Sequence, residues 1–165
     1  EEEIRKECPW ATTGRFGGRK PNIITSLELR SEEMEIINLR IQEKYKKIEE
    51  SEVRFEEYML DDAEYAIVAF GSAARIAKKS IEIARSQGIK VGLLRPITLW
   101  PFPTKEVQKL GEKMKGILSL EINAGQMVED IRLAVAGRVP VQHFGRLGGI
   151  IPDPDEVVDA IKRLF

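Results

Sequence analysis

The stretch Tyr65-Ala66-Ile67-Val68-Ala69-Phe70-Gly71-Ser72 decides the fold of this 165-residue chain. Its first six residues are almost continuously apolar, which predicts a short strand buried on both faces of a sheet. Gly71 and Ser72 then turn the chain into a helix that is expected to reach about Gln87, with Gly88 just beyond its C-terminal end. A buried strand followed at once by a helix is the first half of a βαβ unit.

Strands and helices keep alternating to the C-terminus. Further strands are expected at 89–94, 115–122 and 139–144, and further helices at 104–114, 125–136 and from 154 onward. This alternation predicts right-handed crossovers, and hence a mostly parallel sheet in a three-layer α/β/α domain over residues 61–165. In the last two of these helices, the side chains that we expect to pack in the core are Met127, Ile131, Leu133, Val135, Val157, Val158, Ile161 and Leu164.

The last helix carries a complete start signal. Asp153 suits the N-cap, Pro154 suits the first helical position, and Glu156 completes a capping box.

Residues 1–60 are more polar and more charged than the rest of the chain. Residues 1–29 are expected to be irregular, and a helix is expected over about 31–50 with Ser31 as its N-cap. One face of this helix carries the apolar side chains Met34, Ile37, Ile41, Tyr45 and Ile48. We therefore expect a connector segment whose amphipathic helix rests on a folded neighbour.

The composition and the lengths of the apolar runs argue against several classes of protein. Lys and Arg number 26 against 27 Asp and Glu, so the net charge of −1 does not suggest nucleic-acid binding. No apolar run approaches the ~20 residues that span a bilayer, and no signal-peptide pattern is present, so we expect a cytoplasmic protein without membrane contact. Because the chain begins at Glu1 without Met, we expect a piece of a longer protein or a processed chain.

Metal and redox centres are not expected in this chain. It has one cysteine, Cys8, and one histidine, His143, whereas an iron–sulfur cluster usually needs four Cys ligands and a zinc site a group of Cys and His. No nucleophile or acid stands near His143 in the sequence, so we expect a surface or packed histidine and no catalytic residues.

The turn Gly71-Ser72-Ala73 has two readings. Backbone N–H groups at a helix N-terminus can hold an anion, which makes these residues a weak anion-site candidate. However, the phosphate-binding glycine motifs are absent, and Ser72 as a plain N-cap explains the turn equally well.

Three later loops follow strands, at the edge where open parallel sheets usually bind ligands. In the first, Arg95, Trp100 and Phe102 suit a subunit contact, unless the two aromatic rings pack within the chain. In the second, Asn123 can cap the next helix, but no such explanation is evident for Glu121. The candidates for contacts with a partner are Arg95, Trp100, Phe102, Glu121, Asn123, Gln126 and Arg146, the last able to grip a carboxylate or phosphate.

Four sequence strings together resemble one enzyme family. They are AIVAFGS at 66–72, GLLRPITLWPFP at 92–103, EINAGQMVED at 121–130 and FGRLGGIIP at 144–152. In this order they resemble the C-terminal region of the α subunits of 2-oxoacid:ferredoxin oxidoreductases, most like the 2-oxoisovalerate or 2-oxoglutarate type. KPNIITSL at 20–27 and VRFEEYM at 53–59 extend the resemblance to most of the chain.

The resemblance implies a Rossmann-like domain similar to the C-terminal domain of transketolases, with an antiparallel edge strand. It implies that the whole enzyme uses thiamine diphosphate, Mg²⁺, iron–sulfur clusters and coenzyme A to convert a 2-oxoacid to acyl-CoA and CO₂, reducing ferredoxin. This chain would be a structural and subunit-contact domain that binds no cofactor and is inactive alone. Its partners would be the pyrimidine-binding domain of the same subunit, the β subunit and a ferredoxin-like subunit.

Two other functions are weighed against this one. The chain could be a free-standing α/β module that binds a small molecule or nucleotide through the Gly71-Ser72 turn. It could also be a pure interaction domain similar to receiver proteins, but the paired acidic residues expected after the first strand of a receiver are missing.

Overall fold

The computed structural model describes residues 14, 16–18, 20, 23 and 25–164. The chain forms two compact units, Glu1–Glu43 and Lys44–Phe165. Cys8 lies outside the described residues. Among the described residues, no helix combines the length and the apolar character needed to cross a bilayer.

The first unit contains a short 3₁₀ turn, η1 (Phe16–Gly18), and the larger part of the long helix α2 (Ser31–Ser51). The predicted amphipathic helix is therefore present, although Ser31 is its first residue rather than its N-cap. None of its residues is buried, and the apolar stripe that begins at Met34 stays half-exposed or exposed.

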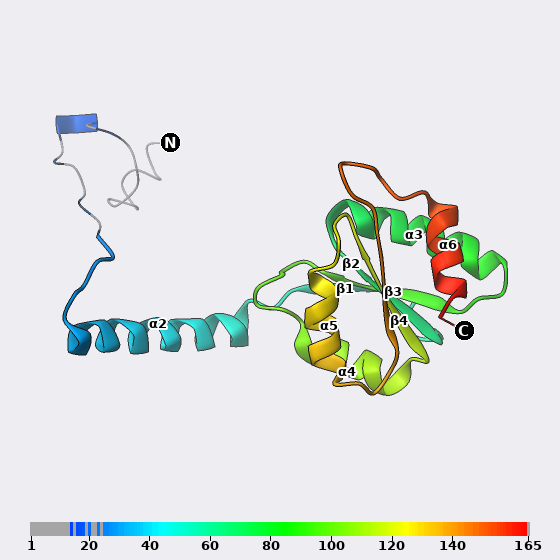
Figure 1. The fold of residues 1–165 in the computed structure, drawn as a ribbon, viewed down its shortest axis with the longest axis horizontal. Coiled ribbons are helices and arrows are strands. Elements are labelled where there is room, and N and C mark those ends of the chain that lie inside the picture. The colour runs from blue at the N-terminus through cyan, green and yellow to red at the C-terminus, as the bar shows by residue number, and fades with distance from the viewer. Residues whose placement is uncertain (1–13, 15, 19, 21–22, 24, 165) are drawn as a thin grey trace. The chain divides into compact units, whose positions relative to one another are not determined.

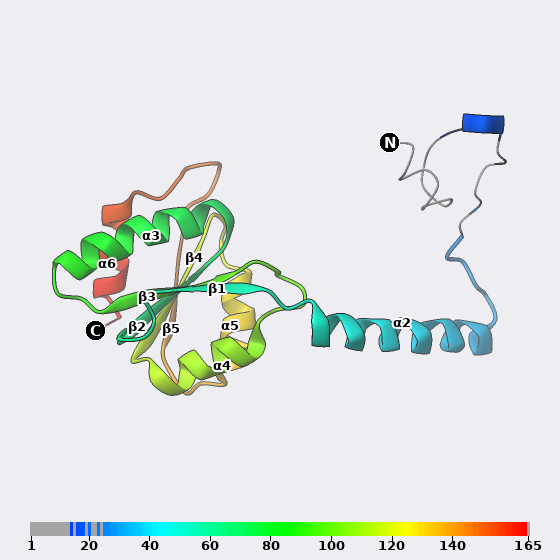
Figure 2. The same cartoon turned by 180° about the vertical axis from the view of Figure 1, so that it is seen from behind.

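The second unit is built on a five-stranded sheet with strand order β1-β3-β2-β4-β5. The four strands β2 to β5 are parallel, while β1 pairs antiparallel with β3 at one edge. Figure 1 shows the sheet with its helices, and Figure 2 shows it from behind. The strands are β1 (Phe55–Tyr58), β2 (Tyr65–Ala69), β3 (Val91–Pro96), β4 (Gly116–Glu121) and β5 (Val141–Gly145).

Helices cover both faces of this sheet, which confirms the predicted three-layer α/β/α fold. One face carries α3 (Gly71–Ser86) and α6 (Pro154–Lys162), and the other carries α4 (Thr104–Lys113) and α5 (Met127–Val135) (Figures 1 and 2). Each face has its own apolar cluster, the first including Ile67, Ile81 and Leu118, and the second including Val68 and Leu94. Alternate residues of the central strand β2 thus enter opposite cores.

The last helix starts as expected. The Asp153 carboxylate accepts the N–H of Asp155 at 2.9 Å, and the Glu156 side chain accepts the N–H of Asp153 at 3.1 Å. Pro154 occupies the first turn, so the predicted capping box is confirmed.

Three local expectations were wrong or incomplete. Leu133 is 81% exposed rather than part of the core, because it lies on the outer face of α5. Ser72 is not an N-cap: the capping position of α3 is Phe70, and no side chain caps that helix. The local sequence pattern also missed β1, which lies within the proposed connector 1–60 and pairs with β3 through Phe55↔Pro96. This strand is the antiparallel edge strand that the family resemblance implies, and that expectation is confirmed. The domain boundary at 61 stays a proposal.

The topology has one switch point. Strands β2 and β4 are neighbours, but α3 leaves β2 toward one face and α5 leaves β4 toward the other. The carboxyl ends of these two strands are where open α/β sheets form a ligand crevice. The Gly71 turn and the loop 122–126 are both at this position.

Candidate functional site

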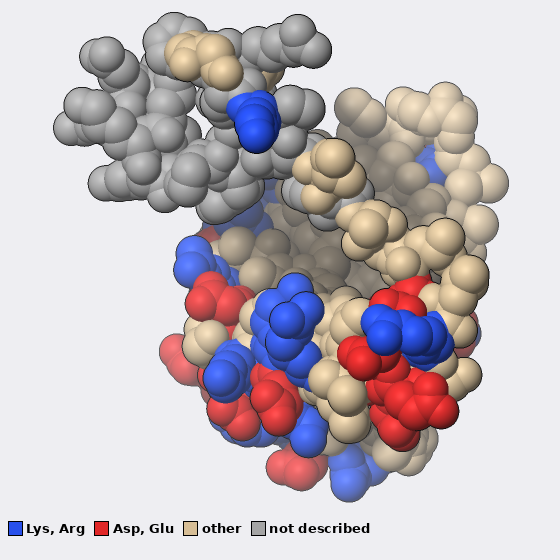
Figure 3. Space-filling model, turned by 90° about the vertical axis from the view of Figure 1, so that its left-hand side faces the viewer, with Lys and Arg blue, Asp and Glu red and all other residues tan. Residues whose placement is uncertain are grey.

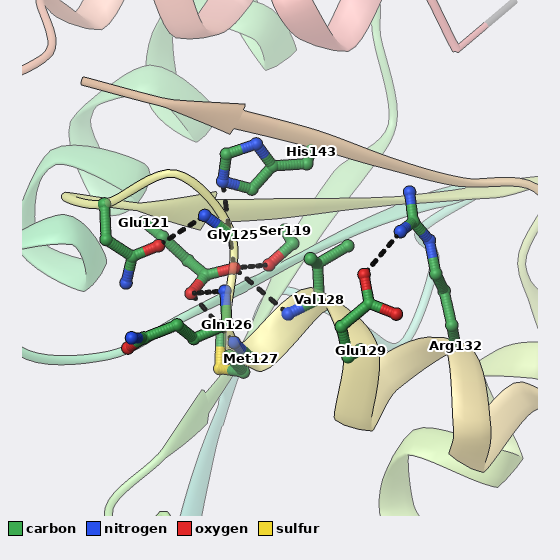
Figure 4. A network of polar contacts seen from close by, with 10 residues as sticks. Ser119, Glu121, Gly125, Gln126, Met127, Val128, Glu129, Arg132 and His143 are labelled. Atoms are coloured by element: carbon green, nitrogen blue, oxygen red, sulfur yellow. Dashed lines mark hydrogen bonds and ion pairs between the residues drawn. The ribbon is translucent and has the colours of Figure 1, made fainter. Parts of the chain in front are cut away.

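Glu121, the last residue of β4, is the best-connected side chain at the switch point. Its Oε1 atom accepts the Ser119 hydroxyl at 2.9 Å and the N–H of Val128 at 3.0 Å (Figure 4). Its Oε2 atom accepts the N–H groups of Gln126 at 3.1 Å and Met127 at 2.9 Å. The carboxylate thus supplies partners for three of the N–H groups that the start of α5 leaves without intrahelical acceptors.

The ionisation of Glu121 depends on these contacts. The side chain has no exposed surface, and burial by itself would raise the pKa of the carboxyl group. The N–H of Met127, the Ser119 hydroxyl and the N–H of Gln126 outweigh burial and lower the pKa below its ordinary value of 4.5. Glu121 is therefore held as an anion at neutral pH, at the positive end of a helix dipole.

Glu121 has a role within the chain that the sequence analysis did not assign to it, because both carboxylate oxygens accept hydrogen bonds from Ser119 and the start of α5. Its predicted contact with a partner stays a prediction. A signal was present in the sequence: an acid within a fully buried strand needs compensation, and the next helix N-terminus offers the nearest donors.

The single histidine packs directly over this carboxylate. His143 lies on β5 opposite Ser119 of β4, and its Nε2 atom is 3.8 Å from Oε1 of Glu121 (Figure 4). Nε2 is buried and has no hydrogen-bond partner among the described residues. A Cβ atom on Gly145 would come within 2.8 Å of Cε1 of His143 and would also collide with the carbonyl oxygen of Asn123. Because residue 145 is a glycine, the His143 ring and the loop that contains Asn123 can both pack close to the backbone of this residue.

The other two candidates of this loop remain accessible. Asn123 is half-buried, and its Oδ1 accepts the N–H of Gly125 at 2.7 Å, so it closes a turn rather than capping α5. Gln126 precedes α5 and is exposed, with no side-chain capping bond. Both stay candidates for a contact with a partner.

The start of α3 differs from that of α5. Gly71 has a φ of 56°, and neither a capping side chain nor an acidic residue stands in the first turn. Gly71 and Ser72 are exposed, whereas Ala73 is buried. No described side chain thus makes a capping hydrogen bond to the N–H groups of this turn.

The loop after β3 forms one wall of a groove within the unit Lys44–Phe165. The groove has a volume of about 790 Å³. We call it the aromatic groove; its apolar lining consists of Val53, Phe55, Trp100, Pro101 and Phe102, and its charged rim of Lys46, Glu49, Glu50, Lys105 and Glu106. The sequence predicts the two aromatic residues of the loop as contact candidates, but it gives no sign of their neighbours from the end of α2 and from β1.

The three candidates of this loop have different surroundings. Trp100 is 54% exposed and meets Tyr45 edge-on, with ring centroids 5.2 Å apart. Phe102 is half-buried against the core on the α4 and α5 face. Arg95 pairs with Glu56 at 2.8 Å across the β1–β3 ladder. Trp100 therefore presents the largest free surface of the three.

Arg146 is also used within the chain, through an ion pair with Glu156 at 2.7 Å. The residues that follow it are apolar and exposed: Leu147, Ile150 and Ile151 are between 52% and 66% exposed. Exposed apolar side chains also follow β3 at Ile97 and Leu99, and β4 at Ile122. The carboxyl-end edge of the sheet is thus largely apolar, as protein interfaces are at their centres.

Charge gives no sign of a nucleic-acid surface on the face drawn in Figure 3, where Lys and Arg are interspersed with Asp and Glu. The described residues contain no group of three or more His, Cys, Asp or Glu side chains that could hold a metal ion.

A family model described as pyruvate:ferredoxin oxidoreductase core domain II matches residues 63–157. The chain belongs to this family. The matched range contains the switch point and the 100–106 side of the aromatic groove, whereas the groove residues 46–55 precede it. The resemblance to 2-oxoacid:ferredoxin oxidoreductases is confirmed.

Curated relatives extend the match beyond core domain II. The ketoisovalerate oxidoreductase subunit VorB of Methanothermobacter thermautotrophicus is 43% identical over 162 residues, which cover 98% of this chain and 46% of that protein. The 2-oxoglutarate synthase subunit KorA of Methanothermobacter marburgensis is 31% identical over 104 residues, or 63% of this chain and 28% of that protein. The chain spans just under half the length of the VorB relative.

Solved structures support the fold. A 2-oxoglutarate:ferredoxin oxidoreductase from Magnetococcus marinus, with 2-oxoglutarate, coenzyme A and succinyl-CoA bound, matches 93% of this chain and 28% of its own, at 21% identity and a TM-score of 0.73. A split-gene transketolase, an inactive β4 tetramer, matches 67% of this chain and 41% of its own, at 14% identity and a TM-score of 0.58. The predicted transketolase-like fold of core domain II is thereby confirmed.

Proposed function

We propose that this chain is the C-terminal structural and subunit-contact domain of the α subunit of a 2-oxoacid:ferredoxin oxidoreductase. The whole enzyme would oxidatively decarboxylate a 2-oxoacid with coenzyme A and ferredoxin, giving acyl-CoA, CO₂ and reduced ferredoxin. The observation that carries the proposal is the 43% identity to VorB along 98% of the chain. Since that relative is a ketoisovalerate oxidoreductase subunit, a branched-chain 2-oxoacid is the proposed substrate.

The arrangement of the switch point supports a structural role. The buried acid at the ligand edge, Glu121, is committed to the N-terminus of α5, and Arg95 and Arg146 are committed to ion pairs. What faces outward at this edge is mainly apolar, with Trp100 as the largest side chain. Exposed Trp in a stiff, proline-bounded loop suits an interface anchor better than a catalytic group.

The proposal assigns the cofactors to other parts of the enzyme. Thiamine diphosphate, Mg²⁺, iron–sulfur clusters and coenzyme A would be held by the pyrimidine-binding domain of the same subunit, the β subunit and the ferredoxin-like subunit, in the cytoplasm. This chain's own contribution would be to present the aromatic groove, Asn123 and Gln126 to those partners. Tight subunit contacts of this kind depend on a few buried aromatic anchors.

Isothermal titration calorimetry tests the division of labour. Thiamine diphosphate with Mg²⁺ is titrated into the 165-residue chain, and into the assembled enzyme as the positive control. We expect heat of binding only from the assembled enzyme. Micromolar binding to the chain alone would overturn the proposed structural role.

A second candidate function has one observation in its favour. The N-terminus of α3 is uncapped, contains no acid in its first turn and lies at the switch point, as an anion site would. A free-standing small-molecule or nucleotide-binding module using Gly71 and Ser72 predicts a rise in melting temperature with phosphate compounds. Ser72→Pro removes one N–H group and should abolish that rise; no rise in the unchanged chain would rule the module out.

A further inference from the structure

We propose that β5 pairs antiparallel with the β5 strand of a second copy of this chain, so that two sheets join edge to edge. β5 is the last strand in the order β1-β3-β2-β4-β5, and among the described strands only β4 pairs with it. In Figure 1 it runs between the layer of α3 and α6 and the layer of α4 and α5. An open strand edge presents free backbone N–H and C=O groups, and another extended strand complements them.

The hydrogen bonds to β4 identify which backbone groups of β5 stay free. The N–H of Ile117 donates to the carbonyl oxygen of Pro140 at 3.0 Å, and Ile117 is opposite Val141 in the parallel register. Because hydrogen bonding alternates along a strand, the even-numbered residues of β5 direct their backbone groups toward β4. The outward-facing residues are then Val141, His143 and Gly145. No described residue hydrogen-bonds to their N–H or C=O groups on that side.

β5 lacks the features that usually protect an edge strand. Its sequence, VQHFG, contains no Lys, Arg, Asp or Glu, and neither a proline nor a bulge interrupts its pairing with β4. Pro140 stands directly before the strand, but its carbonyl oxygen faces β4, and the nitrogen that lacks a hydrogen faces the same way. The proline therefore removes no donor from the outer edge.

The opposite edge of the sheet provides a contrast. β1 carries Glu56 and Glu57 next to each other, and Glu57 is exposed. In an antiparallel pair of two β1 strands, these carboxylates would come close to those of the second copy. Repulsion between like charges thus opposes self-pairing of β1, whereas β5 carries no such charges.

A twofold axis at His143 uses all of the outward-facing groups. His143 would exchange both of its backbone hydrogen bonds with its own copy, and Val141 would do the same with Gly145 of the second copy. On one face of the joined sheet, Val141 would lie opposite this glycine. On the other face, Gln142 would lie opposite Phe144, so no like charges meet. A second copy therefore complements β5 both in hydrogen bonding and in charge.

The same register covers exposed apolar surface beyond the strand. Leu147, which follows β5 closely, is 58% exposed, and Pro140 at the other end of the strand is exposed as well. Continued past Gly145, the antiparallel alignment brings Leu147 alongside Pro140 of the second copy. Burial of these apolar groups adds to the stabilisation by hydrogen bonds.

Analytical ultracentrifugation of the 165-residue chain tests the pairing. From low-micromolar to submillimolar concentrations, we expect the mass to rise from that of the 18.7-kDa chain toward twice that value. A chain that stays monomeric over the whole range would overturn the proposal. Because the pairing concerns β5 alone, this result does not depend on the proposed enzyme activity.

A pair of substitutions at Val141 tests whether the dimer uses the edge of β5. Val141→Pro removes an outward N–H group and leaves the hydrogen bonds to β4 in place. We expect its dimer dissociation constant to rise about tenfold or more, because each dimer loses this hydrogen bond twice. Val141→Ala shortens the same side chain but keeps the N–H group, so its dimer should be weakened much less. Equal weakening by the two substitutions would contradict edge-to-edge pairing.

Amide hydrogen exchange of the unchanged chain decides the question if Val141→Pro does not fold. On going from dilute to concentrated solution, exchange at the outward-facing N–H groups of β5 should slow about tenfold. The N–H groups of Gln142 and Phe144 bond to β4 and should be protected at both concentrations. Concentration-dependent protection that appears only at another surface would show that the dimer forms elsewhere, and it would overturn the assignment of β5.

Discussion

The carboxylate of Glu121, at the end of β4, accepts the backbone N–H of Met127, the first residue of α5, at 2.9 Å. This bond joins a strand to the following helix across a five-residue loop. A residue outside the helix and several positions upstream thus performs the capping that a local Ser, Thr, Asp or Asn usually performs.

Replacing Glu121 by Ala should therefore destabilise the domain strongly. The change leaves buried N–H groups without acceptors and removes a charge-assisted network, for which a loss of about 3 kcal/mol in the free energy of unfolding is expected. Urea unfolding at neutral pH measures it. The matched control is Glu129→Gln, an exposed acid of the same helix, which should cost less than about 1 kcal/mol because its ion pair with Arg132 is exposed to solvent. Equal effects of the two substitutions would show that Glu121 is not a structural cap.

Acid should remove the same contribution. Because the pKa of Glu121 is lowered in the folded chain, its carboxylate stabilises the fold above about pH 4.5, the ordinary value, and loses this effect as the pH falls through the folded pKa. We expect the stability difference between the unchanged chain and Glu121→Gln to shrink between about pH 5 and about pH 3, below the usual titration range of histidine. Glu56, Asp62 and Glu64, whose pKa values are also lowered by basic partners, are common to both proteins and cancel. A difference that stays constant would contradict the burial of an ionised carboxylate.

Gly92 should be intolerant of a side chain. A Cβ atom on this β3 residue would lie 2.7 Å from Cδ2 of Leu60 and would collide with the carbonyl oxygen of Met59. Gly92→Ala is thus expected to cost about 2 kcal/mol or more in urea unfolding. At Gly116 of β4, the closest atoms would be 3.4 Å away, an ordinary contact distance, so Gly116→Ala serves as the control and should cost clearly less. Equal costs would show that the approach of the 59–60 turn to β3 is not as tight as described.

Much of this fold could be predicted from local pattern. The apolar run 65–70 and the capping box at Asp153 depend only on residues that are adjacent in the sequence, and both predictions were confirmed. Strand β1 was missed because Phe55-Glu56-Glu57-Tyr58 is short and half polar, as suits an edge strand whose partner, β3, comes much later in the chain.

The site was less predictable for the same physical reason. Ser72 has a residue type that favours capping, yet Gly71, with its positive φ, already begins the helix. Glu121 was predicted to contact a partner because only its neighbours in sequence were considered. In the fold, its carboxylate oxygens accept the N–H groups of residues 126–128, and its charge faces His143 of another strand. Contacts between residues that are far apart in the sequence cannot be predicted from a short motif.

Trp100 should matter more for assembly than for folding. It is 54% exposed, so Trp100→Ala is expected to change the stability of the isolated chain by about 1 kcal/mol or less, mainly through the lost contact with Tyr45. In the proposed enzyme, the same change should lower the yield of assembled complex, as seen by native mass spectrometry. The control is Leu133→Ala, an 81% exposed residue of α5 outside the sheet edge, which should change neither quantity. Loss of stability in the isolated chain would place Trp100 in the core of the fold instead.

The most direct test of the proposed function is the reduction of ferredoxin by the purified enzyme that contains this chain, measured with 2-oxoisovalerate and coenzyme A. We predict that reduction requires both compounds and is accompanied by formation of the acyl-CoA and CO₂. Ferredoxin that stays oxidised with 2-oxoisovalerate, and also with other 2-oxoacids in its place, would contradict the activity proposed for the enzyme that contains this chain.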